Sequence, residues 1–350
     1  MPRIRHTTLT QFLIEERRRF PSATGGFNRL ILDVATACKA IARAVSLVNL
    51  ETRENATTGR EAVTQLEAFS QECFLHFNRD NTALAALLSP DLPPHVVDEG
   101  ADAEHLLVFD ALDGSTNVDI NAPLGSIFSV LRTPAAGRAV TAEDFLQKGR
   151  AQVAAGYAFY GPATMFVLSV GTGVHGFTLD PTFGDFMLTH RDLQVPAETR
   201  ELSINASNGL FWEPPVKRYV RECMAGKTGE RGEDFSTRWV DSTVADAHRM
   251  LLRGGVFLYP VDTRTSGDRE RHRLLFGANP IGFLVEQAGG RASTGDGPLL
   301  EVQPTDLDQR VGLVVGSRSE VERIERYHAD PGGSTSNHPL FNEVGLFRDR

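Results

Sequence analysis

The spacing of apolar residues along the chain follows two different periods, and it predicts a mixture of helices and strands. In residues 28–48 apolar positions recur every three or four residues, which is typical of one face of a long amphipathic helix. The same spacing predicts three further helices, at residues 62–77, 244–252 and 281–288, the last of them closed by Gly289 and Gly290. Short apolar runs predict strands at residues 106–109, 126–131, 153–160, 164–170, 255–260 and 311–316. The expected fold class is therefore α/β or α+β, built in layers.

The organisation of the chain suggests two packed halves followed by an extension. A polar stretch with a proline at residues 193–202 marks the expected junction between the halves. We expect an N-terminal α/β subdomain at residues 1–197, a C-terminal α/β subdomain at residues 198–328 and an extension at residues 329–350. The extension opens with Pro, Gly and Ser and ends with apolar residues, a pattern typical of a flexible link to a docking arm.

Composition narrows the class of protein. With 41% apolar and 23% charged residues the chain has the profile of a soluble globular protein, and no apolar run approaches the roughly 20 residues that span a bilayer. The N-terminus has no apolar core of a signal peptide, and the three cysteines, Cys38, Cys73 and Cys223, lie far apart. Both observations favour the cytoplasm. A net charge of −9 argues against nucleic acid as a partner, and no membrane partner is expected.

A GxGxxG pattern at residues 170–176 matches the fingerprint of dinucleotide-binding proteins. That fingerprint needs a helix to begin at the glycines, so that the helix N-terminus can hold the pyrophosphate. Here the following residues are rich in strand formers and then reach a proline. We therefore expect a hairpin with a glycine turn and no dinucleotide cofactor.

The segment FDALDGSTNVD at residues 109–119 carries the candidate chemistry. We expect Asp110 at the end of a strand and Asp113 in the turn after it, where both carboxylates can converge on one point. Two convergent carboxylates suit a hard divalent ion, above all Mg²⁺. Gly114 permits a tight turn, and Ser115 or Thr116 can cap a following turn whose N–H groups favour phosphate. The alternative is an ordinary Asp-Gly turn with a helix cap, but the full DxxDGSTN pattern at a strand end is more specific.

Several segments of the chain resemble class 1 fructose-1,6-bisphosphatase, within the lithium-sensitive sugar and inositol phosphatase superfamily. They occur in that family's order and cover roughly residues 20–328: NATTGREAVTQLEAFSQE, DALDGSTNVD, SIFSVLR, GYAFYGPATMFVLSVGTGVHGFTLDP, LSIN, STVADAHRMLLRGGVFLYP, RLLFGANPIGFLVEQAGG and PTDLDQR. The resemblance implies a layered αβαβα sugar-phosphatase fold and a cytoplasmic homotetramer. It also implies hydrolysis of the 1-phosphate of fructose 1,6-bisphosphate with two or more Mg²⁺ ions, for which Mn²⁺ is the expected substitute.

The resemblance also assigns roles to individual residues. The metal ligands it implies are Glu99, Asp110, the carbonyl of Leu112 and Asp113. Glu67 corresponds to the carboxylate that orients the attacking water. Substrate contacts are implied for Asp113, Gly114, Ser115, Thr116, Asn205, Arg238, Tyr259 and Arg271, with Arg238 reaching into the neighbouring subunit's site.

Departures from the family pattern fall on the chemistry itself. Gly100 and Gly277 replace glutamates, Glu67 replaces an aspartate and Arg271 replaces a lysine; Ala111 and Trp239 replace a proline and a tyrosine. We therefore expect an intact first metal site and a weakened second one. Two alternatives stay open: a phosphatase that prefers another sugar bisphosphate such as sedoheptulose 1,7-bisphosphate, with Asn208 near its sugar pocket, and a catalytically weak paralogue that binds sugar phosphate. The TGGF segment at residues 24–27 lacks an acidic residue of the family's AMP site, which puts AMP inhibition in doubt.

Overall fold

The computed structural model describes residues 7–18, 25–54, 59–90, 92–97, 103–134, 139–263 and 272–330. The predicted C-terminal link and arm beyond residue 330 lie outside these ranges. Within them the helices have the following bounds: α1 Leu9–Arg17, α2 Gly25–Glu54, α3 Gly59–Asn78, α4 Pro214–Met224, α5 Thr243–Arg253, α6 Asn279–Gln287 and α7 Arg318–Ala329.

The described strands form two sheets and a short ribbon. The first sheet has the order β2-β1-β3-β4-β5-β6-β7-β8. Its strands are β1 Leu84–Leu88, β2 His95–Val96, β3 His105–Asp113, β4 Leu124–Arg132, β5 Ala154–Tyr160, β6 Thr164–Ser169, β7 Val174–Asp180 and β8 Asp185–Leu193. The second sheet has the order β10-β9-β11-β15-β13, and β12 pairs with β14. These strands are β9 Glu201–Ile204, β10 Ser236–Thr237, β11 Val256–Tyr259, β12 His272–Arg273, β13 Arg291–Ser293, β14 Arg310–Val311 and β15 Leu313–Gly316.

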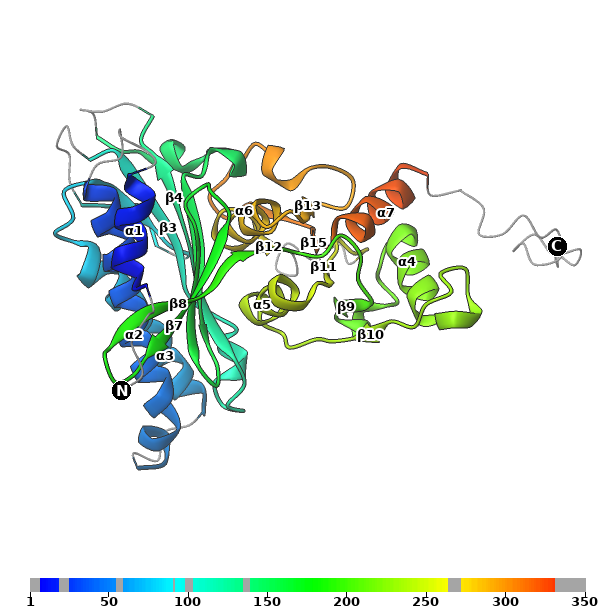
Figure 1. Cartoon of the computed structure of the whole chain (residues 1–350), viewed down its shortest axis with the longest axis horizontal. Coiled ribbons are helices and arrows are strands. Elements are labelled where there is room, and N and C mark those ends of the chain that lie inside the picture. The colour runs from blue at the N-terminus through cyan, green and yellow to red at the C-terminus, as the bar shows by residue number, and fades with distance from the viewer. Residues whose placement is uncertain are drawn as a thin grey trace, which may run out of the picture.

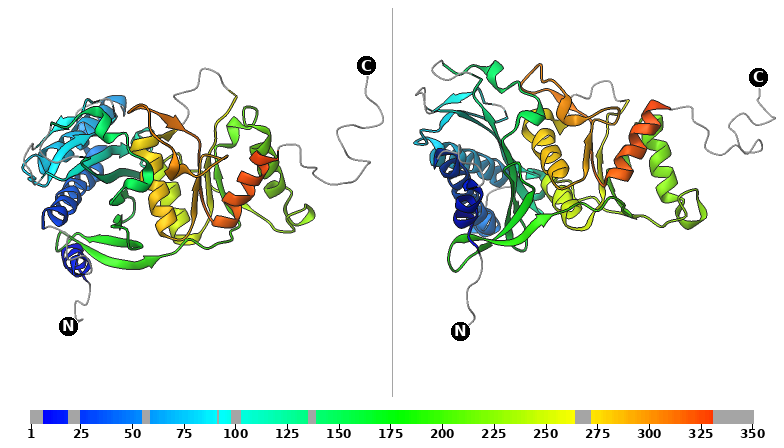
Figure 2. Two further views of the ribbon diagram at one scale, coloured as in Figure 1. Left: turned by 90° about the horizontal axis from the view of Figure 1, so that it is seen from above. Right: turned by 45° about the horizontal axis from the view of Figure 1, so that its top comes forward.

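The elements stack in five layers, which confirms the expected αβαβα architecture (Figure 1). Helices α1, α2 and α3 cover the outer face of the first sheet, and α5 and α6 lie between the two sheets (Figures 1 and 2). Helices α4 and α7 cover the far face of the second sheet. One apolar cluster lies between the outer helices and the first sheet, and a second surrounds α5 and α6 between the two sheets. A third lies between the second sheet and α4 and α7.

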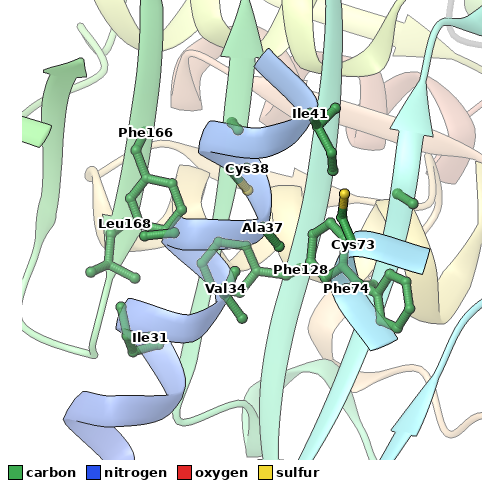
Figure 3. Packing of buried hydrophobic residues seen from close by; sticks show 14 of the residues in the cluster. Ile31, Val34, Ala37, Cys38, Ile41, Cys73, Phe74, Phe128, Phe166 and Leu168 are labelled. Atoms are coloured by element: carbon green, nitrogen blue, oxygen red, sulfur yellow. The ribbon is translucent and has the colours of Figure 1, made fainter. Parts of the chain in front are cut away.

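The outermost interface explains why the helical periodicity of residues 28–48 is so regular. Ile31, Val34, Cys38 and Ile41 of α2 point at the sheet, where they meet apolar residues such as Phe128 (Figure 3). All four side chains are fully buried. The three- and four-residue steps between them place them on one helix face, as the sequence predicts.

The helix predictions are confirmed, with ends that lie one to six residues beyond the predicted ones at most boundaries. In the glycine-rich stretch at residues 170–176, residues 170–173 connect β6 to β7, and these strands pair antiparallel, so the hairpin prediction is confirmed. Gly171 and Gly173 have φ angles of 88° and 96°, which glycine adopts without strain. The strand predicted at residues 311–316 is confirmed over Leu313–Gly316, which form β15, but Gly312 separates it from β14 and the two strands pair with different partners.

Candidate active site

A β-bulge brings the two aspartates of the DALDGSTN motif to the same face of the first sheet. Asp110 pairs with Ile127 and Asp113 with Gly125, so β3 advances three residues while β4 advances two. In a regular strand, residues three apart point to opposite faces, and the extra residue cancels that alternation. Asp113 therefore lies within the strand and not, as predicted, in the turn after it.

The bulge is held by hydroxyl groups beneath it. The Ser126 hydroxyl donates to the Ala111 carbonyl at 2.7 Å, and the Tyr160 hydroxyl lies 2.7 Å from the same serine oxygen. Because Ser126 has only one proton to give, Tyr160 donates to it. Ser126, Tyr160 and Ala111 are buried, so this chain of hydrogen bonds fixes the backbone between the two aspartates.

The N-terminus of α5 holds the Asp113 carboxylate from the other half of the chain. Its Oδ2 atom accepts from the Ser242 hydroxyl at 2.7 Å and from the Val244 N–H at 2.9 Å. Ser242 is also the N-cap of α5, since its Oγ accepts from the Ala245 N–H at 3.2 Å. A negative side chain at a helix N-terminus is favoured by the exposed N–H groups and the helix dipole.

Gly114 is required by the close approach of these two segments. Its φ angle is 77°, and a Cβ atom at this position would lie 2.8 Å from the Ser242 Cβ. Gly114 itself occupies the N-cap position of the short 3-10 turn Ser115–Asn117, without a side-chain cap. The predicted capping role of Ser115 or Thr116 is therefore wrong.

Both aspartates resist ionisation in the absence of a cation. Burial, followed by the neighbouring charge of Asp113, raises the pKa of Asp110 to about 7. Burial also raises the pKa of Asp113, although the Val244 N–H and the hydroxyls of Ser242 and Thr243 partly offset it. Two half-buried carboxylates that repel each other are stabilised by a cation placed between them.

The aspartates line a cleft of about 250 Å³ between the two sheets. One wall carries positive charge: Arg273 and Arg310 are Cα partners in the β12–β14 pair, and both form ion pairs with Asp308, at 2.8 and 3.5 Å. The opposite end is aromatic. The cleft is lined by Asp110, Asp113, Ile127, Trp239, Asp241, Ser242, Thr243, Phe257, Tyr259, His272, Arg273, Phe276, Gly277 and Arg310. Acidic, basic and aromatic walls in one cleft suit a ligand with phosphate and sugar parts.

A smaller hollow adjoins the aromatic end of the cleft and shares Trp239 and Tyr259 with it. Asn205 and Asn208 also line this hollow. The Asn205 side-chain oxygen accepts from the Ser207 N–H at 3.1 Å and from the Ser207 hydroxyl, so the side chain is fixed by its own turn. The structure thus brings the predicted sugar-side residues Asn205 and Tyr259 together.

The other predicted residues are placed less uniformly. Glu67 on α3 is exposed and lies outside the cleft lining, although it is close enough to raise the pKa of Asp110 slightly. Arg238 is exposed and lines a separate hollow with Glu201 and Asp246. Ser115 and Thr116 lie beside the cleft residues in sequence but outside the lining, whereas Leu112 is buried in the bulge. Glu99, Gly100 and Arg271 lie outside the described residues.

Several cleft residues were missed by the sequence prediction, among them Ser242, His272, Arg273 and Arg310. Ser242 precedes the helix predicted at residues 244–252 and opens the family-like segment STVADAHRMLLRGGVFLYP, but the sequence assigns it no role of its own. His272, Arg273 and Arg310 lie on strands of two residues, which are too short to show a periodicity. The family-like segments RLLFGANP and PTDLDQR do contain Arg273 and Arg310, and they are the one signal in the sequence that could have found them.

The donor set fits a hard divalent cation. Asp110 and Asp113 supply carboxylate oxygens, and such ions are commonly held by one or two carboxylates with water and phosphate in the remaining positions. Among the residues that the structure describes, no group of three or more His, Cys, Asp or Glu side chains is arranged to hold a metal. A Cβ atom at Gly277 would lie 3.5 Å from His272 Nδ1, with no other non-local atom within 4 Å, so the wall there is open.

The chain is similar to proteins of one family along nearly its whole length. The family model described as "Fructose-1-6-bisphosphatase, N-terminal domain" matches residues 7–191, and "Fructose-1-6-bisphosphatase, C-terminal domain" matches residues 195–329. The class 1 fructose-1,6-bisphosphatase of Hydrogenophilus thermoluteolus is 57% identical over 352 residues, which cover 98% of each chain. A class 1 fructose-1,6-bisphosphatase of Methylibium petroleiphilum is 50% identical, over 100% of this chain and 99% of the relative.

Solved structures agree with the sequence relatives. The holo form of fructose-1,6-bisphosphatase from Leishmania major superposes with a TM-score of 0.84 at 35% identity, over 92% of this chain and 99% of the other. Its T-state superposes with a TM-score of 0.81 at 35% identity, over 93% and 99% of the two chains. No described helix is long and apolar enough to cross a membrane.

Proposed function

This chain belongs to the class 1 fructose-1,6-bisphosphatase family, and we propose that its cleft releases the 1-phosphate of fructose 1,6-bisphosphate, leaving fructose 6-phosphate. The observation that carries this proposal is that Asp110 and Asp113 line one cleft together with the paired Arg273 and Arg310. A phosphate ester placed between these walls has a cation site on one side and guanidinium donors on the other. The aromatic end then accommodates the sugar.

We assign the cation to Mg²⁺, held by Asp110, Asp113, the Leu112 carbonyl and Glu99. When bound, the ion neutralises phosphate charge and acts as a Lewis acid on the phosphoryl group. The protein's own part is to orient: the bulge aims Asp110 and Asp113 at one point, and the Ser242 hydroxyl prevents Asp113 from rotating away. Gly114, Ser115 and Thr116 follow Asp113 directly and are the proposed donors to the 1-phosphate.

The sugar end is assigned to Asn205, Tyr259 and Arg271, and the water-orienting carboxylate to Glu67. Glu67 lies near enough to influence Asp110, which supports this assignment. In this arrangement the proposed N-terminal half, residues 1–197, supplies the carboxylates, and the proposed C-terminal half, residues 198–328, supplies the sugar end. Asp113 and Ser242 join the two halves.

We propose that a second cation binds more weakly than the first. Gly277 contributes no side chain to the cleft wall, and the described residues offer no third carboxylate that joins Asp110 and Asp113 in a metal-binding group. Isothermal titration in the presence of fructose 6-phosphate and phosphate should give one tight Mg²⁺ site per chain. Two or more tight sites would contradict this part of the proposal.

The protein is further proposed to work as a cytoplasmic homotetramer. The exposed side chain of Arg238 supports a role in a neighbouring subunit's site, and the three cysteines, all free and buried, suit a reducing compartment. Sedimentation analysis of the purified chain tests the assembly. Mixed assemblies of an Arg238→Ala chain and an Asp113→Asn chain test whether sites are shared, because sharing makes their activity depart from the sum of the two parents.

The hydrolysis itself is tested by following phosphate release from fructose 1,6-bisphosphate as Mg²⁺ is added, with ³¹P NMR to identify the remaining ester. We expect fructose 6-phosphate as product and a loss of at least a hundredfold in kcat for Asp110→Asn. Release without added divalent ion, or full activity of Asp110→Asn, would refute the proposal.

Sedoheptulose 1,7-bisphosphate is a second candidate substrate, because Asn208 and Trp239 line a hollow that continues the cleft beyond Tyr259. A longer sugar could extend into that hollow. Comparing kcat/KM for the two bisphosphates decides between them, and a higher value for the seven-carbon sugar would replace the fructose assignment.

A further inference from the structure

His272 stands in the cleft wall between the carboxylate end and the aromatic end, and the proposed reaction assigns it no role. It is the first residue of β12 and precedes Arg273. Its ring packs edge-on against Tyr259, with centroids 4.7 Å apart and planes at 73°, and against Phe257 at 6.1 Å and 70°. These contacts fix the plane of the imidazole, so each ring nitrogen has a defined direction.

A hydrogen bond with Thr243 engages one ring nitrogen of His272. Nε2 lies 3.4 Å from the Thr243 hydroxyl oxygen, and Nε2 donates in this contact when it carries the ring proton. Burial, with a smaller contribution from Arg310, lowers the pKa of His272 to about 4, so the ring is neutral at pH 7. A neutral ring with its proton on Nε2 has a lone pair on Nδ1.

That lone pair faces open space. No described residue donates a hydrogen bond to Nδ1, and the nearest wall is Gly277, whose missing side chain would begin 3.5 Å away. The rings of Tyr259 and Phe257 flank His272 in the cleft wall, and the guanidinium groups of Arg273 and Arg310 only donate. His272 therefore offers a neutral ring nitrogen to the cleft, beside the ring of Tyr259.

We propose that His272 Nδ1 accepts a hydrogen bond from a hydroxyl group of the bound sugar, which makes His272 a specificity-determining residue of this cleft. The inference rests on the proposed function in so far as the ligand is a sugar phosphate. A site built to bond a hydroxyl discriminates strongly against an analogue that lacks it. The metal-binding alternative, with Nδ1 as a nitrogen ligand, is less favoured because no described group of three metal-ligating side chains includes His272.

Two substitutions separate the ring nitrogens. In His272→Asn the amide takes the place of Nδ1 and keeps an acceptor there, whereas in His272→Gln the amide takes the place of Nε2 and keeps only the Thr243 contact. Binding of fructose 6-phosphate, measured by isothermal titration with Mg²⁺ present, should weaken about tenfold in the Gln variant and less than threefold in the Asn variant. Binding of inorganic phosphate, which has no sugar, should change in neither.

The binding measurement does not depend on catalytic turnover. If the phosphatase assignment is wrong, the wild type releases no phosphate from fructose 1,6-bisphosphate, and this outcome is distinct from any change in binding. Equal weakening of fructose 6-phosphate binding in both variants would indicate a structural role and overturn the inference. An altered Mg²⁺ affinity in the Gln variant, with sugar binding unchanged, would mean a nitrogen ligand and overturn it as well.

The wild-type protein provides an independent test if either variant folds poorly. Among fructose 6-phosphate analogues that each lack one hydroxyl, one should bind about tenfold more weakly than the parent. His272→Gln should not weaken that analogue further, because the bond is already missing. If every deoxy analogue binds the wild type as tightly as the parent does, His272 accepts no hydrogen bond from a sugar hydroxyl and the inference is overturned.

Discussion

Replacing Ser242 by alanine tests whether the N-terminus of α5 holds the candidate site together. The Ser242 hydroxyl makes two contacts that alanine cannot: it donates to Asp113 Oδ2 at 2.7 Å and accepts from the Ala245 N–H at 3.2 Å. Loss of an N-cap costs about 1 kcal/mol, and a hydrogen bond to a charged group contributes roughly 1.5–3 kcal/mol. We expect the free energy of unfolding to fall by roughly 2–4 kcal/mol when both losses are combined.

The assay is urea unfolding of the metal-free protein at pH 8, because the ionised fraction of Asp113 rises with pH and its pKa is raised. Thr8→Ala is a matched control, because Thr8 caps α1 through the Gln11 N–H at 3.2 Å and does not touch the cleft. The control should lose about 1 kcal/mol. In addition, Ser242→Ala should weaken Mg²⁺ binding about tenfold, since outer groups that orient a metal ligand typically contribute that much. Equal unfolding losses in the two variants, with unchanged Mg²⁺ affinity, would refute the reasoning.

Three further predictions follow from buried groups. Because the pKa of Asp110 is raised to about 7, its contribution to the stability of the metal-free protein is present at low pH and is lost as pH rises through 7. Below pH 7 Mg²⁺ must displace the proton of Asp110, so the affinity for Mg²⁺ should rise by up to about tenfold per pH unit towards pH 7. Calorimetry at pH 6 in two buffers measures the protons released on binding, and no release would contradict this prediction. The native protein should not react with a thiol reagent, whereas the unfolded protein should react at three thiols, because burial raises the pKa of each: Cys38 to about 12, Cys73 and Cys223 to about 11. Arg231→Ala should lower the free energy of unfolding by about 3–5 kcal/mol, because it leaves Glu320 buried without its partner at 2.6 Å, while the exposed Lys227→Ala control should be far milder in the same urea titration.

The sequence predicted the elements that bury a continuous apolar face and the motif that carries the carboxylates. Residues 28–48 are predictable because every third or fourth side chain of α2 meets the sheet. The bulge is not predictable, because it exists only relative to the partner strand, where Gly125 and Ile127 fix the register. The hydrogen bond from Ser242 to Asp113 is not predictable either. The two residues lie 129 positions apart, and a serine before a helix indicates only an N-cap.

The basic wall could not be predicted for a related reason. Arg273 and Arg310 become neighbours only through a ribbon of two-residue strands, and nothing in their local sequence indicates that pairing. The family resemblance identified the two segments that contain these arginines, although their local sequence shows no periodicity. The sequence shows that residue 277 has no side chain, but only the structure shows that this residue lies in the cleft wall.

The most direct test of the account is the rate of phosphate release from fructose 1,6-bisphosphate as a function of Mg²⁺ and Mn²⁺, for the wild type beside Gly277→Glu. The new Cβ would be in ordinary contact with His272 Nδ1 at 3.5 Å, so the variant should fold. We predict that the wild type turns over with either ion, and that the added carboxylate lowers the half-saturating Mg²⁺ concentration several-fold with little change in kcat. A wild type that releases almost no phosphate, beside a Gly277→Glu variant that gains activity, would contradict the claim that this cleft is a working phosphatase.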